Sequence, residues 1–193
     1  MGGDANATDV KQAREVHYAS MKRRALGARQ RGGGTKTPPG TKETGVKAMS
    51  GAGAAEGLPT VADDGTITMN FHQINQDGAG PLTATVDSTS GGSDPAAFKP
   101  AEVTQNVPGI AAGFSTATNM DFPVTIQMAP GTTCSGTVGG VNNVCIARIQ
   151  NATPAGPFGG AIAFTQSTAG RKRSIEYNIA KRRFARAARA IKA

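Results

Sequence analysis

TITMNFHQINQDGAGP, residues 66–81, sets the expectation for the whole chain. Apolar and polar residues alternate through its first half, so that Ile67, Met69 and Phe71 would share one face of an extended backbone. This two-residue period is typical of a β-strand with one buried face. The rest, 75–81, is rich in Asn, Asp, Gly and Pro, which favour turns. The stretch therefore predicts a strand followed by a turn.

The same alternation returns further along the chain. It occurs in LTATV (82–86), FPVTIQM (122–128), VCIARIQ (144–150) and GAIAFTQ (160–166). Turn-forming residues separate these segments, and nothing between them has the length and period of a crossover helix. We therefore predict an all-β fold, an antiparallel β-sandwich, with a flexible basic N-terminal region and a C-terminal basic helix.

Charge is distributed unevenly along the 193 residues, whose formal net charge is +8. Residues 1–48 hold ten Lys/Arg and four Asp/Glu, 49–170 hold two and eight, and 171–193 hold nine and one. An acidic middle thus lies between two basic ends, which excludes a uniformly basic nucleic-acid-binding chain. Aromatic residues make up only 5% of the chain, too few for a surface on which bases stack, so no nucleic-acid partner is predicted.

Three regions follow from charge and composition. Residues 1–55 are predicted to be a basic, mostly disordered region with a short helix from Asp9 to Ala25, where Asp9 would cap the first turn. Within this region 27–45 is rich in Gly, Pro, Thr and Lys and predicts a linker. Residues 56–170 are predicted to form the β-sandwich domain, and 171–193 a basic amphipathic helical tail.

The predicted C-terminal helix has an apolar stripe and a basic face. The stripe consists of Tyr177, Ala180, Phe184, Ala187 and Ile191, and the opposite face of Arg182, Arg183, Arg186, Arg189 and Lys192. Such a helix suits an anionic membrane, an acidic partner or the acidic core of its own chain. A solvated cationic tail is the alternative.

His72 is the residue of the opening stretch best suited to chemistry. It alternates with the apolar face, so we expect it to point away from the core, and with Gln73, Asn75 and Asp77 it forms a candidate binding set. A zinc site needs three or four close ligands, and a copper histidine brace needs an N-terminal histidine and a second one. The only other histidine is His17, and residue 1 is methionine. No metal or other cofactor is predicted.

Catalytic residues are not predicted either. No Gly-x-Ser-x-Gly elbow leads into a helix. Paired carboxylates for glycoside cleavage could come from Asp63, Asp64, Asp77, Asp87 and Asp94. All five lie near predicted turns or strand ends, where acids are common because they bond to the backbone.

The two cysteines, Cys134 and Cys145, bracket a Gly/Asn-rich turn. A disulfide across so short a loop would add about 2–3 kcal/mol to stability and would indicate an oxidising compartment. Free thiols in a cytosolic protein are the alternative.

The sequence contains two opposing indications about secretion. The first 18 residues lack the apolar segment of a secretory signal, whereas Asn6 and Asn151 each begin an N-glycosylation sequon.

Several segments together resemble the Egh-like virulence factors of filamentous fungi. The resemblance spans about residues 57–180 and rests on TITMNFHQINQDGAGPL (66–82), NVPG (106–109), FPVTIQM (122–128), CSGTVGGVNNVCIARIQN (134–151) and AGPFGGAIAFTQS (155–167). Its two signatures are the segment from His72 to Pro81 and a turn made of Gly156, Pro157, Phe158, Gly159 and Gly160.

The resemblance implies a secreted, disulfide-bonded β-protein expressed while a fungus penetrates its host. It implies no particular reaction. We expect a non-catalytic module that binds cell-wall polysaccharide or a host surface. The alternative is a polysaccharide-active, copper-dependent enzyme that uses His72 near Asn75 and Asp77.

This chain departs from the family pattern in three places. Members of this family usually begin with a signal peptide and a longer N-terminal region. Many also have a cysteine after the Gly-Pro-Phe-Gly-Gly turn, where this chain has Ala161, and another shortly after Gly-Ala-Gly-Pro, where it reads Leu82-Thr83-Ala84. The joint loss of these two cysteines is what the absence of one disulfide pair would produce.

Overall fold

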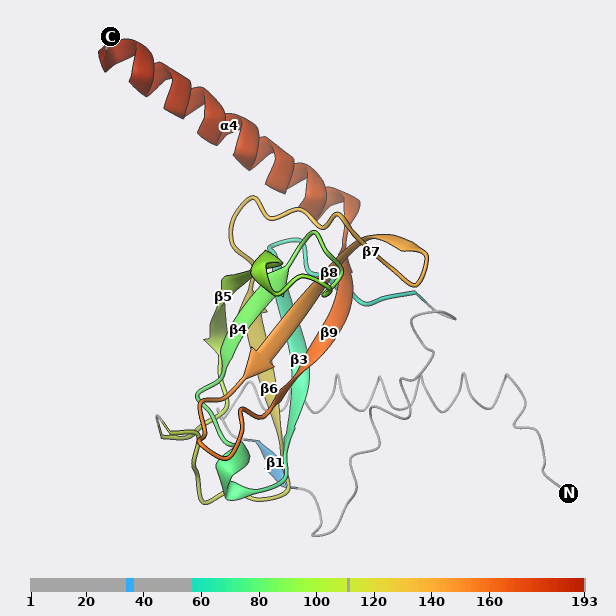
Figure 1. Cartoon of the computed structure of the whole chain (residues 1–193), viewed down its shortest axis with the longest axis vertical. Helices are drawn as coiled ribbons and strands as arrows, with labels where there is room; N and C mark the ends of the chain where they lie inside the picture. Colours follow the sequence, from blue (N-terminus) through green and yellow to red (C-terminus); the bar gives the residue numbers. More distant parts are fainter. Residues whose placement is uncertain (1–33, 37–56, 111, 193) are drawn as a thin grey trace, which may run out of the picture.

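The computed structural model describes residues 34–36, 57–110 and 112–192 (Figure 1). Within these residues the protein is mostly β-structure, with a single α-helix, α4, at its C-terminal end. The strands are β1 (Thr35–Lys36), β2 (Thr60–Val61), β3 (Thr66–Gln73), β4 (Thr83–Asp87), β5 (Phe98–Gln105), β6 (Met120–Gln127), β7 (Gly136–Val138), β8 (Val141–Gln150) and β9 (Gly159–Gln166). Two short 3₁₀ turns are η1 (Gln76–Gly78) and η2 (Pro95–Ala97). The prediction of a mostly β chain with a C-terminal basic helix is confirmed.

The strands form one curled, mixed sheet with the shape of a half-barrel. Its order is β1-β6-β5-β4-β8-β9-β2, while β3 also pairs with β6 and β7 with β8. β5 joins the two halves, because its first residues pair with β4 and its last with β6, and its register shifts between Val103 and Gln105. The predicted sandwich is not confirmed, since this shared strand makes the halves continuous. Strictly antiparallel pairing is wrong, since β2 runs parallel to β9.

The apolar core lies inside the curl and draws on both halves of the sheet. Its buried members are Val61, Ile67, Leu82, Ala84, Val86, Val107, Phe122, Val124, Ile126, Met128, Cys134, Cys145, Ala147, Ile149 and Phe164. Met69 and Phe71 pack against this cluster and are partly buried. The alternation predicted for the first strand is therefore confirmed. Each fully buried aliphatic or aromatic side chain contributes roughly 1.5–3 kcal/mol.

The described part of the N-terminal region contains one short strand. Thr35 and Lys36, inside the predicted linker, form β1 and pair antiparallel with Asp121 and Met120 of β6. The predicted helix at residues 9–25 lies outside the described residues. The division of the chain at residues 55 and 170 stays a prediction.

α4 (Thr168–Lys192) leaves one end of the half-barrel and projects away from it (Figure 1). Its first half is attached to the sheet: Arg173 pairs with Asp63 at 3.3 Å, and Asn178 Nδ2 donates to the Gly131 carbonyl oxygen at 2.8 Å. From residue 179 to 189 every residue is exposed. No helix of the described chain is long and apolar enough to cross a membrane.

Candidate interaction surface

Loops from distant parts of the sequence meet at the end of the half-barrel opposite α4, here called the loop end (Figure 1). The loop after β3 lies against the 106–119 loop through main-chain hydrogen bonds. Ala79 N donates to Gly113 O at 3.1 Å, and Ser115 N donates to Gln76 O at 2.9 Å. Backbone groups buried away from water need such partners, so these bonds fix one loop against the other.

Gln73, one of the predicted binding residues, supports this arrangement from inside. Its side chain is 1% exposed, and its Nε2 donates to the carbonyl oxygens of Asn75 and Ala117 and to the Ser115 hydroxyl, at 2.8–3.0 Å. A buried amide that bonds to two loops holds both in place. Gln73 therefore positions the loops.

Asn151 plays the corresponding part from the β8 side. It is 3% exposed, and its Nδ2 donates to the Asp77 carbonyl oxygen at 2.8 Å and to that of Ala79 at 3.1 Å. Its Oδ1 accepts from Phe158 N at 2.9 Å. The sequon at Asn151 thus begins with a buried, fully engaged side chain, and oligosaccharide attachment to it is incompatible with this fold.

Two signature glycines allow the loops and strands to approach closely. A Cβ placed on Gly80 would lie 1.8 Å from the Val107 carbonyl oxygen, and one on Gly159 would lie 1.9 Å from that of Ile149. Only glycine fits where two backbones come this near. The signature turns at 78–81 and 156–160 are therefore explained in part by packing at the loop end.

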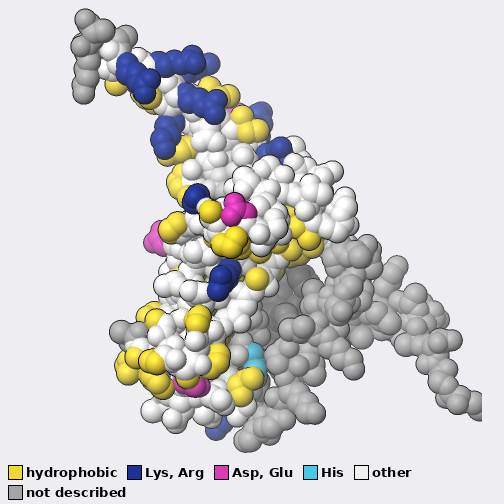
Figure 2. Space-filling view, in the orientation of Figure 1, with side chains coloured by type: hydrophobic (Ala, Val, Ile, Leu, Met, Phe, Trp, Pro, Cys, Tyr) yellow, Lys and Arg dark blue, Asp and Glu magenta, His cyan; other side chains and the backbone are white. Residues whose placement is uncertain are grey.

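Four large apolar side chains remain exposed on these loops, and we call them the loop-end patch. They are Ile74, Ile110, Phe114 and Phe158, with exposed fractions of 56%, 65%, 39% and 40%. Ile110 and Phe114 pair across a short turn. Figure 2 shows hydrophobic side chains gathered at this end of the molecule. Grouped exposed apolar side chains indicate an interaction surface, whereas isolated ones are ordinary.

His72 has a partner outside the predicted binding set. The β3–β6 register places it opposite Asp121, and its Nδ1 lies 2.6 Å from the Asp121 Oδ1, with side-chain exposures of 11% and 13%. It points out of the core as predicted, but it is largely covered. Within the described residues no group of three or more His, Cys, Asp or Glu could hold a metal ion. His72 and Asp121 alone supply fewer donors than a copper centre needs.

Asp87, one of the candidate catalytic acids, organises a turn. Its carboxylate accepts from the main-chain N–H groups of Thr89, Ser90 and Gly92 and from the Ser90 hydroxyl. Burial raises the pKa of Asp87, but the hydrogen bonds from Ser90, Thr89 and Gly92 outweigh burial and hold it well below the usual value. Asp64 has a lowered pKa through its bonds to Thr66. Both carboxylates accept hydrogen bonds from nearby main-chain N–H groups and so stabilise the local backbone.

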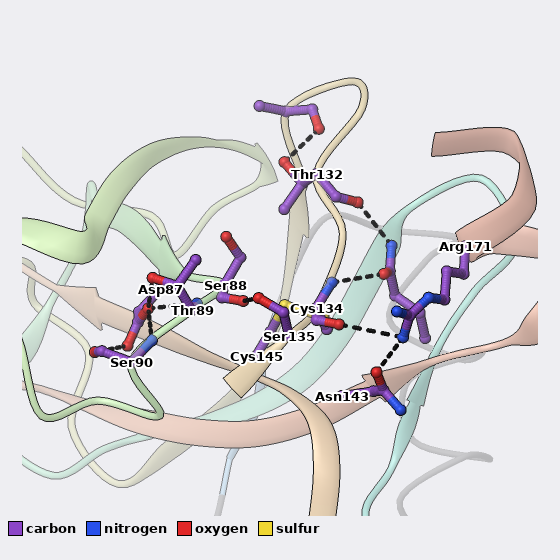
Figure 3. Close-up of a disulfide and its surroundings, with 12 residues drawn as sticks. Asp87, Ser88, Thr89, Ser90, Thr132, Cys134, Ser135, Asn143, Cys145 and Arg171 are labelled. Atoms are coloured by element: carbon purple, nitrogen blue, oxygen red, sulfur yellow. Dashed lines mark hydrogen bonds between the residues drawn. A yellow bond between two sulfur atoms is a disulfide. The ribbon is translucent and has the colours of Figure 1, made fainter. Parts of the chain in front are cut away.

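The cysteines form a disulfide, as predicted (Figure 3). Cys134 precedes β7 and Cys145 lies in β8, and both are fully buried. Arg171, at the start of α4, donates from Nη1 to the Cys134 carbonyl oxygen at 3.4 Å and to the Asn143 side-chain oxygen. Gln166 accepts from Cys134 N at 2.8 Å. The disulfide therefore also supports the base of α4.

These features define a disulfide-stabilised β-protein whose loops present an apolar surface. The chain belongs to the family described as Egh16-like virulence factor, whose model matches residues 4–159. It is 63% identical over 186 residues to the appressoria-specific virulence factor GAS2 of Pyricularia oryzae. That match covers 96% of this chain and 64% of GAS2, so the chain spans a little under two thirds of that relative.

A more distant relative is the appressoria-specific virulence factor GAS1 of Pyricularia oryzae. It is 38% identical over 106 residues, which cover 55% of this chain and 41% of GAS1. No solved structure matches this chain. The resemblance noted in the sequence is therefore confirmed at the level of the family.

Proposed function

We propose that this protein is a secreted, non-catalytic virulence factor that binds cell-wall polysaccharide through the loop-end patch. The observation that carries the proposal is the grouping of Ile74, Ile110, Phe114 and Phe158 on loops that internal hydrogen bonds hold in place. Ordered loops lose little conformational freedom on binding, which favours affinity. The rings of Phe114 and Phe158 could pack against the C–H faces of sugar rings.

Two further observations support a role outside the cell. Relatives of this chain are named appressoria-specific virulence factors, and a virulence factor is expected to act on a host. The buried Cys134–Cys145 disulfide is typical of proteins that fold in an oxidising compartment.

Co-sedimentation with insoluble chitin, cellulose and β-1,3-glucan tests the binding. We expect the protein to pellet with at least one of them, and the double variant Phe114→Ala/Phe158→Ala to bind about tenfold or more weakly, since buried aromatics dominate interface energies. Ile175→Ala/Tyr177→Ala is the matched control, because both residues are 45% exposed but lie on α4. No pelleting, or equal losses in both variants, would refute the proposal.

The same pellets test whether the module is catalytic. We expect no soluble oligosaccharide to appear above a no-protein blank, with or without added copper and a reductant. Release that is abolished by His72→Ala would instead establish the polysaccharide-active alternative.

Intact mass of the native protein, with and without reduction, tests the location. We expect the oxidised form in culture fluid, recognised by a gain of about two mass units on reduction, one hydrogen per cysteine. Recovery of only the reduced form, and only from cell extract, would contradict secretion.

A further inference from the structure

The outer half of α4 is a helix without a packing partner among the described residues. From residue 179 to 189 every residue is exposed, and Phe184 is 77% exposed. Figure 1 shows this half extending beyond the sheet. Alanine and arginine favour helix, but an unpacked helix of this length is marginal in water and gains most stability by contact with a surface.

Charge on this outer half has one sign only. Residues 179–189 contain five Lys/Arg and no Asp/Glu, and Figure 2 shows Lys and Arg side chains along the helix. At 3.6 residues per turn, Ala180, Phe184, Ala187 and Ala188 fall within an arc of about 100°. Lys181 and Arg183 lie on either side of this arc. The result is a narrow apolar stripe flanked by cations.

We propose that the outer half of α4 lies on an anionic lipid surface, with the Phe184 stripe at the acyl boundary and the cations among the headgroups. Long basic side chains beside an apolar stripe suit this position, because their stems cover apolar surface while their charges reach the phosphates. The field of a planar anionic surface extends about 8–10 Å, close to the width of a helix, so it also attracts the arginines on the far side.

Two other occupants fit less well. A second copy of α4 would place Lys181 and Arg183 beside the same cations of its partner, and like charges that flank a helix seam oppose pairing. An acidic partner helix would contact Lys181 and Arg183 but would leave Arg182, Arg186 and Arg189 largely unused. The spread of cations around the helix therefore favours an extended anionic plane.

Vesicle flotation with the full chain tests the charge requirement. We expect binding to vesicles of 70% phosphatidylcholine and 30% phosphatidylserine, and none to pure phosphatidylcholine. Lys181→Gln/Arg183→Gln should weaken binding roughly 30-fold, because each cation near an anionic surface contributes about fivefold to the affinity. Lys99→Gln/Arg148→Gln removes two charges from the sheet instead and should change binding less than twofold. Equal losses in the two variants would overturn the proposal.

A second pair of variants tests the orientation of the helix. Phe184→Ala should weaken vesicle binding about tenfold by removing the main apolar contact. Ile175→Ala, on the opposite side of the helix and 45% exposed, should have little effect. Far-UV circular dichroism would confirm that both variants keep the helix. Absence of binding to the anionic vesicles by the unaltered chain would overturn the proposal in favour of an acidic protein partner.

Discussion

Replacing Asp87 by Asn tests whether a buried carboxylate holds the turn after β4. Asp87 Oδ1 accepts from Thr89 N at 2.8 Å and Ser90 N at 2.9 Å, and Oδ2 accepts from Gly92 N at 2.6 Å and from the Ser90 hydroxyl. The amide of asparagine keeps one acceptor oxygen, but its NH2 group would face the donors that the second carboxylate oxygen now accepts from. The substitution thus changes hydrogen bonding with almost no change of shape.

The expected loss follows from the donors that are left without an acceptor. The Ser90 hydroxyl can rotate to a new acceptor, but the Gly92 N–H is fixed by the backbone. A donor that loses its partner in a buried carboxylate costs about 1–3 kcal/mol, and the loss of a charged acceptor adds to this. We expect Asp87→Asn to lower the free energy of unfolding at pH 7 by about 2–3 kcal/mol.

Acid should reduce the difference in free energy of unfolding between the unaltered protein and Asp87→Asn. The sign of this effect follows from the lowered pKa of Asp87. Burial opposes the charged form, but the bonds from Ser90, Thr89 and Gly92 outweigh it, so the folded pKa lies below the unfolded value of about 3.9. The stabilisation is therefore complete above the unfolded pKa and is lost as pH falls below it. At pH 3 the carboxyl of the unfolded chain binds a proton, which lowers the free energy of unfolding of the unaltered protein by about 1.3 kcal/mol. The variant has no carboxyl at this position, so its free energy of unfolding does not change for this reason.

Urea unfolding followed by far-UV circular dichroism at pH 7 and pH 3 measures both quantities, since the chain lacks tryptophan. The control is Asp94→Asn, because Asp94 is exposed and caps η2 by accepting from Ala96 N at 2.9 Å, a role that Asn fills equally well. A loss in Asp87→Asn no larger than in the control would refute the reasoning. So would a loss of equal size at both pH values.

Three further substitutions probe the core and the loop end, each by urea unfolding. Cys134→Ala/Cys145→Ala should lower the free energy of unfolding by about 3 kcal/mol, from the entropy of closing a loop with a sequence separation of 11. Gly80→Ala should cost about 3 kcal/mol or prevent folding, because its Cβ would overlap the Val107 carbonyl oxygen. Asn151→Ala should cost at least about 2 kcal/mol, since its three hydrogen bonds are lost together.

Local patterns predicted the longer alternating strands, β3, β4, β6, β8 and β9. The alternation around Ile67 is a property of neighbouring residues, and a half-buried strand imposes it directly. The parallel pair formed by Thr60 and Val61 could not be found in this way, because two residues contain no period and the partner strand lies about 100 residues away. The shared strand β5 was not predicted at all, because its apolar residues Phe98, Ala101 and Val103 do not keep a two-residue period.

The role of each residue at the candidate site depends on contacts with residues far away in the sequence. The sequence therefore identified some of these residues but not what their side chains do. Gln73 stood among the predicted binding residues, but its buried amide supports the loops. Asn151 matched a glycosylation pattern, but its side chain faces inward. Phe114 was missed because its segment has no period. The apolar residues on either side of a Gly-containing turn, GIAAGF at 109–114, were the one available signal.

The two proposed surfaces lie at opposite ends of the molecule, the loop end on one side and the outer half of α4 on the other (Figure 1). A helix that lay on lipid would therefore leave the loop-end patch free to contact a polysaccharide. Sites this far apart without shared residues contribute independently, so variants at one end should not change binding at the other. This arrangement requires a firm attachment of α4 to the sheet. At the base of the helix Arg171 donates to the Cys134 carbonyl oxygen and so attaches α4 to the disulfide loop. A protein that held both ligands at once would connect a membrane to the wall beside it.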